Sequence, residues 1–372
     1  MTESTRGLQL VSTLHEDGTL VAELVEREVA PPQGHEVLVR IEAAPINPSD
    51  LALLFGPADL ANAQYAGGKV SARMPEAALR AMAGRVGEAM PVGNEGAGTV
   101  IAAGDAPEAQ ALVGKRIACV AGGMFAQYRL ADARGCMVLP DQISAEEGAA
   151  AFVNPLTALG FVETMRREGH HALVHTAAAS NLGQMLVRIC REDAVPLVNI
   201  VRSREQAQLL AGLGAEHVVD SSRDDFAERL VEAIAATKAT LGFDAVGGGK
   251  LAGQILAAME TVASRGQAYS RYGSTSAKQV YIYGALDLGP TILNRSFGLT
   301  WGVGGWLLTP FLAKVGEHNV ERLRARVLDG LTTTFASRYK ARIPLAQALS
   351  PEAIAAYNAK ATGAKYLLLP SG

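Results

Sequence analysis

A run of small residues between an apolar segment and a helix-forming segment is the clearest candidate for chemistry. The stretch at 171–184 reads HALVHTAAASNLGQ, and we expect a short strand there, followed by a helix from about Asn181. This order directs unpaired N–H groups and the positive end of a helix at one point, which suits a diphosphate. The usual G-x-G-x-x-G pattern is degenerate, because Ala178 and Ser180 replace its first two glycines and only Gly183 remains. A plain junction whose small residues only allow close packing is an equal alternative.

Two arginines follow the next expected strand. The stretch VNIVRSRE carries Arg202 and Arg204 where an NAD site would place an acidic residue for the ribose hydroxyls. A fork of N–H donors matches a 2′-phosphate bidentately. The pair therefore favours NADP(H) over NAD(H), and the alternative is that both arginines only solvate the start of a helix.

The elements that would position these residues alternate between strands and helices. We expect strands at 172–175, 196–201, 217–219 and 243–246, and helices at 181–191, 204–213, 226–235 and 250–259. This alternation predicts an α/β fold with a doubly wound parallel sheet and helices on both faces.

The residues before about 152 predict β structure instead. Apolar and polar residues alternate in EVLVRIEAA at 36–44, as in a half-buried strand. Within 57–91 four apolar residues recur at helical spacing, which predicts one amphipathic helix with Pro75 at its first position. These four residues are Leu79, Met82, Val86 and Met90.

A change to helix-forming residues begins at Ser144. Ser144 and Glu147 have the spacing of a capping box, and Pro155 should kink or split the helix that follows. We therefore expect a domain boundary near residue 152.

Composition excludes several classes of partner. The 372 residues are 49% apolar and carry a formal net charge of −3 without a basic block, so we expect a small-molecule substrate rather than nucleic acid or a membrane. Cys119, Cys136 and Cys190 are scattered without a C-x-x-C pair, which argues against a disulfide framework and a zinc lobe and predicts buried or neutral thiols. No signal-peptide pattern or long apolar run is present, and we expect a cytoplasmic protein.

Several motifs occur in the order found in a known family. EVLVRIEAAPINPSD, PVGNEGAGTV, the strand–AAASNLGQ–helix segment, LGAEHVVD, FDAVGGG and YGALDLG together resemble the medium-chain dehydrogenases/reductases, most closely their zinc-free quinone oxidoreductases and 2-enoyl thioester reductases. The resemblance implies a GroES-like catalytic β domain over 1–152 and a Rossmann NADP-binding domain over 153–317. Residues 318–372 would return to the catalytic domain, and the active site would lie in the cleft between the domains.

The resemblance also implies roles for particular residues. Asn47 and Thr157 match positions that line the nicotinamide end, and Tyr65 is the available candidate for the proton donor of the enoyl reductases. Nine residues match cofactor-binding positions: Ser180, Asn181, Leu182 and Gly183 at the diphosphate, Arg202 and Arg204 at the 2′-phosphate, and Tyr283, Gly284 and Ala285 beside the nicotinamide.

A metal is not expected at this site. The zinc-dependent relatives have Cys and His where this chain has Ile46 or its neighbours and Asn94, and Glu95 alone does not supply a tetrahedral site.

The chain departs from the family pattern at several places. Ala52 and Ala58 stand near positions where quinone reductases often carry Tyr. A longer segment at 264–284 contains Arg271, Tyr272 and Lys278, which would border the site or a subunit contact. The stretch from 297 to 311, with Trp301 and Trp306, resembles the edge strand through which relatives form homodimers. Burial under the helix expected at 319–331 is the alternative.

The predicted function is hydride transfer from NADPH, without zinc, to a quinone or another conjugated carbonyl compound. A 2-enoyl thioester reductase of the same family is one alternative, and it would need a proton donor for the α-carbon. A non-catalytic NADPH-binding protein is another. A methyltransferase is disfavoured because a β domain precedes the nucleotide fold.

Overall fold

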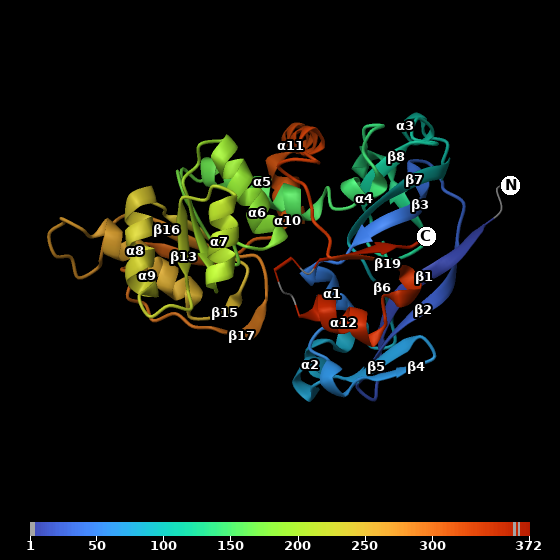
Figure 1. Ribbon diagram of the computed structural model, residues 1–372, viewed down its shortest axis with the longest axis horizontal. Coiled ribbons are helices and arrows are strands. Elements are labelled where there is room, and N and C mark those ends of the chain that lie inside the picture. The colour runs from blue at the N-terminus through green and yellow to red at the C-terminus, as the bar shows by residue number, and fades with distance from the viewer. Residues whose placement is uncertain (1–3, 360–361, 364) are drawn as a thin grey trace. The chain divides into compact units, whose positions relative to one another are not determined.

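The chain folds into two compact units. The computed structural model describes residues 4–359, 362–363 and 365–372. Unit 1 comprises Met1–Val153 with Val327–Gly372, and unit 2 comprises Asn154–Arg326. Figure 1 shows the elements of both. Within the described residues, no helix is long and apolar enough to cross a lipid bilayer.

Unit 1 is built around two β-sheets. Its strands are β1 (Thr5–Leu14), β2 (Thr19–Val29), β3 (Glu36–Pro45), β4 (Gln64–Ala66), β5 (Lys69–Arg73), β6 (Ala89–Pro91), β7 (Glu95–Ala103), β8 (Arg116–Val120), β9 (Tyr128–Asp132), β10 (Met137–Val138), β19 (Ala341–Pro344) and β20 (Tyr366–Leu369). One sheet has the order β4-β5-β2-β1-β6, and the other has the order β10-β8-β7-β3-β20-β19 with β9 also paired to β3. Their apolar faces, which include Leu10, Ile41 and Ile117, form one core.

The C-terminal segment completes unit 1. Strand β20 pairs antiparallel with β3, with Leu368 opposite Ala44, and β19 lies beside β20. The helices of unit 1 are short: α1 (Pro48–Leu54), α2 (Glu76–Ala81), α3 (Pro107–Gln110), α4 (Ala145–Gly148) and α12 (Pro351–Asn358).

The single amphipathic helix expected within 57–91 is wrong. The segment forms the hairpin β4–β5, the six-residue helix α2, a 3₁₀ turn at 83–85 and strand β6. Pro75 is the N-cap of α2 rather than its first residue. Gly84 and Gly87 explain the early end, because glycine disfavours a helix interior and Gly87 has φ +82°. Met90 instead pairs with Ser12 in the sheet.

The expected capping box is confirmed. The Glu147 N–H donates to Ser144 Oγ (3.2 Å), and the Ser144 N–H donates to Glu147 Oε2 (2.8 Å). The helical pattern is split as expected, into α4 and α5 (Val153–Arg167), and Pro155 lies in the first turn of α5, where proline is tolerated.

Unit 2 contains the expected parallel α/β sheet. Its strands are β11 (Leu173–His175), β12 (Leu197–Val201), β13 (His217–Asp220), β14 (Leu241–Asp244), β16 (Lys278–Ile282) and β18 (Trp301–Gly305). They lie in the order β13-β12-β11-β14-β16-β18, and every neighbouring pair is parallel. This is the order of a doubly wound nucleotide-binding sheet, with its switch point between β11 and β14. Strands β15 (Gly247–Gly249) and β17 (Asp287–Thr291) form a separate pair.

Helices cover both faces of this sheet. The helices of unit 2 are α5, α6 (Asn181–Glu192), α7 (Arg204–Gly212), α8 (Phe226–Thr237), α9 (Leu251–Ala263) and α10 (Leu308–Val315), and α11 (Glu317–Asp329) begins in unit 2 and ends in unit 1. Val174 and Val198 face α8 and α9 in one core, while His175 and Phe243 face Phe161 of α5 on the other side. Successive strand residues therefore serve opposite faces, as the near-continuous apolar strands require.

Candidate functional site

The turn after β11 has the expected strand–turn–helix form. Helix α6 begins at Asn181, as predicted, and Ser180 is its N-cap. The Gly183 N–H donates to Ser180 Oγ (3.1 Å), and the Ala178 N–H donates to the Ile200 carbonyl of β12 (3.1 Å). The Ser180 hydroxyl hydrogen is left to donate elsewhere, because its oxygen acts as the acceptor in the cap.

Close packing fixes the residue types in this turn. A Cβ atom at Gly183 would lie 2.1 Å from the Ala178 carbonyl oxygen, so only glycine fits there. Ala177, rather than Ala178 or Ser180, has the left-handed backbone (φ +50°). Close packing is therefore sufficient to require glycine at 183, and it does not conflict with ligand binding, since it brings the start of α6 close to the strand.

The two arginines lie at the carboxyl end of β12. Arg202 follows the last residue of the strand, Arg204 begins α7, and both side chains are exposed. Ser203 between them caps α7 by accepting a hydrogen bond from the Gln206 N–H (3.3 Å). The cap holds the backbone of both arginines at the edge of the sheet where nucleotides bind in this topology.

The switch point of the sheet is fixed by two residues that the sequence analysis missed. Thr176, after β11, donates from Oγ1 to Asp244 Oδ1 of β14 (2.7 Å) and accepts from the Ala245 N–H (2.8 Å). Asp244 also accepts from the N–H groups of Val246 (2.9 Å) and Gly247 (3.2 Å). The loops that leave the two strands are thereby joined. The acid before the glycine run in FDAVGGG was the available signal.

Tyr283 follows β16 and is tied to β11. Its hydroxyl lies 2.7 Å from Nε2 of His175, and its ring packs on Phe161. Burial lowers the pKa of His175 to about 3, so the imidazole is neutral, and burial raises the pKa of Tyr283. A Cβ at Gly284 would lie 2.6 Å from the Ala245 carbonyl oxygen. The expected nicotinamide segment 283–285 thus lies against the end of β14, at the switch point.

Lys278 is not a border residue of a site. Its side chain is fully buried in unit 2, where Nζ lies 2.6 Å from Glu260 Oε2 and donates to Ser274 Oγ (3.0 Å) and the Ser276 carbonyl (2.8 Å). It anchors the inserted segment to α9. Arg271 and Tyr272 lie exposed in that segment, with the guanidinium 4.5 Å from the ring centre.

A second group of polar residues gathers in unit 1 around Asn47, the N-cap of α1. Asp50 accepts from the N–H groups of Asn47 (2.7 Å) and Asn94 (2.8 Å). Glu95 accepts from Asn47 Nδ2 (2.8 Å) and from the N–H groups of Phe152 (3.0 Å) and Val153 (2.8 Å). Two buried carboxylates therefore hold the loop 47–50, the GNEG turn and the start of α5 together.

The charges of this group are strongly perturbed. Loss of hydration, with a contribution from Glu95, raises the pKa of Asp50 to about 7, and burial also raises the pKa of Glu95. Burial lowers the pKa of Lys365, although both carboxylates oppose this shift. Lys365 Nζ and Tyr339 Oη are buried, and among the described residues neither atom has a hydrogen-bond partner. From the sequence, Glu95 was considered only as a possible zinc ligand, and no local pattern pointed to Lys365.

Thr157 and Tyr65 make none of the hydrogen bonds described for this group. Thr157 is buried in α5 and belongs to unit 2. Tyr65 lies on the short strand β4, opposite Val70 of β5, with 39% of its surface exposed. Their catalytic roles stay predictions. In the part of the chain that the structure describes, no three His, Cys, Asp or Glu side chains gather as metal ligands would.

Known proteins are similar to parts of this chain in sequence. Residues 33–141 match the alcohol dehydrogenase GroES-like domain. The chain is 29% identical over 223 residues to the human mitochondrial enoyl-[acyl-carrier-protein] reductase, covering 58% of this chain and 53% of that protein. It is 30% identical over 159 residues to a quinone oxidoreductase of Pseudomonas aeruginosa, covering 42% of this chain and 49% of that protein. The chain thus spans about half the length of these curated relatives.

A solved structure is similar over the whole chain. A proposed NADPH:quinone reductase from Mesorhizobium loti matches with a TM-score of 0.76 and 27% identity, covering 100% of both chains. The GroES-like match, the sheet order and these relatives agree with the resemblance seen in the motifs. These similarities support the branch of the zinc-independent medium-chain dehydrogenases/reductases that contains the quinone oxidoreductases and enoyl reductases.

Proposed function

We propose that this protein is an NADPH-dependent, zinc-independent oxidoreductase that reduces a quinone or another conjugated carbonyl compound. The observation that carries the proposal is the pair Arg202 and Arg204 at the end of the second strand of a nucleotide-binding sheet. An acidic residue there would select the ribose hydroxyls of NAD, whereas two guanidinium groups select a 2′-phosphate.

The residues of unit 2 fit the rest of the nucleotide. The first-turn N–H groups of Asn181 and Leu182 have no acceptor within α6, and the Ser180 hydroxyl keeps its hydrogen, so all three suit a diphosphate. Tyr283, Gly284 and Ala285 lie at the switch point, where the nicotinamide would bind. When bound, NADPH would supply the hydride, and the protein would orient it and exclude water.

Two classes of compound, quinones and enoyl thioesters, are candidates for the acceptor of the hydride. One relative is named a quinone oxidoreductase and another an enoyl-[acyl-carrier-protein] reductase. A quinone accepts hydride without an obligatory protein acid, whereas an enoyl thioester needs a proton delivered to its α-carbon. Asn94 and Glu95 in GNEG and the Arg-x-Arg pair resemble the enoyl reductases, whereas reduction of a quinone would not require Tyr65 as a proton donor.

The test is titration of the protein with NADPH and NADH, followed by turnover with a panel of quinones, enones and enoyl thioesters. We expect preferential binding of NADPH and its oxidation by at least one quinone. Preference for NADH would refute the assignment of the arginines. Tight NADPH binding without turnover of any acceptor would support a non-catalytic NADPH-binding protein instead.

The role of Tyr65 separates the two substrate classes. If its hydroxyl delivers the proton, Tyr65→Phe lowers kcat for an enoyl thioester about 10²-fold and leaves NADPH affinity and quinone turnover unchanged. Steady-state kinetics with both acceptors measure this. Tyr269→Phe is the matched control, since Tyr269 is 93% exposed. Unchanged enoyl turnover in Tyr65→Phe would remove Tyr65 as the acid.

We also propose a homodimer that pairs two sheets through β18. This strand lies at the end of the sheet order, and Trp306 after it packs inward on Phe161 and Phe311 rather than occupying the edge. An edge strand with unpaired N–H and C=O groups is a ready surface for a second copy. We expect sedimentation velocity at micromolar concentration to give twice the chain mass, and a monomer would contradict the proposal.

A further inference from the structure

Two cysteines face each other across strands β8 and β10 in unit 1. These strands are antiparallel with Met137 opposite Ala118, so one further step along the register places Cys136 opposite Cys119. Cys136 has extended backbone angles (φ −82°, ψ 148°) that continue the strand. The pair is therefore cross-strand, although the two residues are 17 positions apart in the sequence.

The hydrogen-bond pattern identifies the kind of pair. The Leu139 N–H donates to the Arg116 carbonyl (2.9 Å), and bonded and non-bonded pairs alternate along an antiparallel ladder. Cys136 and Cys119 thus form a non-hydrogen-bonded pair, and the Cys136 N–H accordingly donates to Ala133 within its own turn (3.1 Å). Such pairs have Cα atoms about 4.5 Å apart and the closest side chains, within the range that a disulfide spans.

The two thiols influence each other, and neither is part of a disulfide. A hydrogen bond with the Cys136 side chain, together with burial, raises the pKa of the Cys119 thiol. The Cys136 thiol donates to the Asp132 carbonyl (3.3 Å) and is half-buried. Neither sulfur is engaged in a disulfide.

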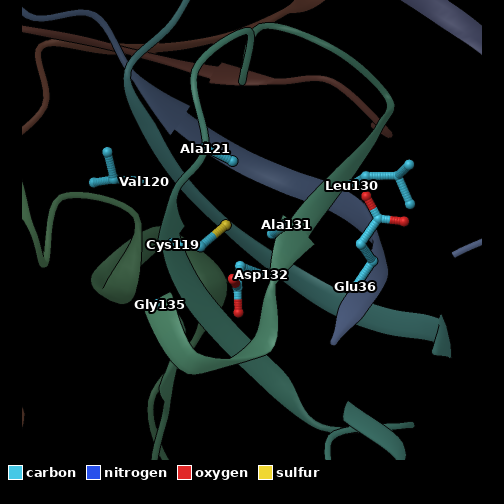
Figure 2. A pocket seen from close by; sticks show the side chains of 8 residues that line it. All are labelled: Glu36, Cys119, Val120, Ala121, Leu130, Ala131, Asp132 and Gly135. Carbon is cyan, nitrogen blue, oxygen red and sulfur yellow. The ribbon is translucent and has the colours of Figure 1, made fainter. Parts of the chain in front are cut away.

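A cavity reaches the Cys119 side of this pair. Cys119 lines a cavity of about 320 Å³ together with Asp132 and Gly135, the residue before Cys136. Figure 2 shows the Cys119 sulfur directed into the space between its own strand and the strand that carries Ala131 and Asp132. The volume is sufficient for a hydroperoxide, since one water molecule takes up about 30 Å³.

We propose that Cys119 and Cys136 are a site of reversible disulfide formation, with a hydroperoxide as the oxidant. The Cys136 sulfur attacks the peroxide, whose O–O bond breaks, and a sulfenic acid and water (or an alcohol) form. The Cys119 sulfur then attacks the Cys136 sulfur, the S–S bond forms, and the leaving hydroxide takes the Cys119 proton as water. The two thiols lose two electrons in total, and the hydroperoxide gains them.

The pair is connected to the Asn47 group by the sheet. Cys119 is paired on its other side with Gly96 of β7, and Glu95 precedes Gly96. A disulfide would lock β8 to β10 one strand away from the carboxylate that holds Asn47. The disulfide would thus restrain the strand next to the one that carries Glu95.

Peptide mapping of the full chain tests the proposal. Arg129 and Arg134 lie between the two cysteines, so trypsin separates them onto different peptides unless a disulfide joins them. After mild treatment with hydrogen peroxide, we expect one joined pair of peptides, a fall in alkylated thiols from three to one, and recovery on addition of dithiothreitol. Three retained thiols, an intermolecular link, or Cys136 driven to sulfinic acid without a link would overturn the proposal.

Two variants extend the test. Cys119→Ser should abolish the link and leave a sulfenic acid at Cys136 that dimedone traps, and Cys136→Ser should abolish the link without such an adduct. If Cys119→Ser fails to fold because its site is buried, Cys136→Ser still decides, since its side chain is half-buried. Cys190→Ser is the control, and a link that disappears in this control would contradict the assignment.

Discussion

Replacing both Arg202 and Arg204 with serine (Arg202→Ser and Arg204→Ser) is expected to raise the Kd for NADPH about 100-fold, while the Kd for NADH changes less than about twofold. Hydrogen bonds to a charged group contribute about 1.5–3 kcal/mol each, and each 1.4 kcal/mol is a factor of ten in affinity. NADH has no 2′-phosphate and therefore gains nothing from either guanidinium. Fluorescence titration with each nucleotide measures the two constants.

The variant is suited to this test because it leaves the backbone support intact. Both side chains are exposed, and the cap of α7 comes from Ser203, which is unchanged. Arg223→Ser is the matched control, since Arg223 is an exposed arginine of unit 2 that pairs with Asp225 (2.8 Å). Equal losses for NADPH and NADH, or a loss of the same size in the control, would show that general charge rather than 2′-phosphate recognition is involved.

Local signals explain why the parallel sheet of unit 2 could be predicted. Strands β11, β12 and β14 are short, buried and mostly apolar runs. Helices α6 and α7 follow Ser180 and Ser203, whose side chains cap them. Such signals lie within a few residues of one another. The sequence therefore contained the elements that place the turn at 177–183 and the arginines after β12.

The apolar pattern within 57–91 was compatible both with a helix and with short strands and turns. Leu79, Met82 and Val86 pack on the core of unit 1, but only α2 and a 3₁₀ turn carry them. The expected helix failed because strand pairing of Met90 with β1 and the glycines before it outweighed helical spacing.

Contacts between distant positions were not predictable from local pattern. Asn47 meets Glu95 across 48 positions, and His175 meets Tyr283 across 108. Lys365 approaches the two carboxylates only because β20 returns to β3. Asn47 and Tyr283 were named through family resemblance, whereas the partners that fix them emerge from the fold.

Asp50→Asn and His175→Gln are expected to change the pH dependence of stability in opposite directions. Loss of hydration, with Glu95 adding to it, raises the pKa of Asp50 to about 7, and burial lowers the pKa of His175 to about 3. In the folded protein Asp50 therefore stays protonated up to about pH 7, and His175 stays neutral down to about pH 3. Asp50 belongs to unit 1 and His175 to unit 2.

For Asp50 the unfolded chain loses its proton near pH 3.8, whereas the folded chain keeps it to about pH 7. The folded state therefore binds more protons in this interval, and the free energy of unfolding falls as pH rises from about 4 to about 7. The full shift corresponds to about 4 kcal/mol at 1.36 kcal/mol per pKa unit.

For His175 the unfolded chain gains a proton near pH 6.5, whereas the folded chain stays neutral to about pH 3. The unfolded state binds more protons here, so the free energy of unfolding falls as pH drops through this interval. The full shift corresponds to about 5 kcal/mol. The contributions of His175 and Asp50 oppose each other between about pH 4 and pH 6.5.

Guanidinium unfolding between pH 4.5 and 7 measures both effects. Trp301 and Trp306 lie in unit 2, so their fluorescence follows that unit, while circular dichroism follows both units. Asp50→Asn should make the free energy of unfolding rise more steeply with pH, and His175→Gln should make its slope with pH more negative. The exposed His15 provides the control His15→Gln, which should keep the slope of the parent protein. If both variants also kept that slope, the pKa values of Asp50 and His175 would be the same in the folded and the unfolded chain, which would contradict the shifts attributed to burial.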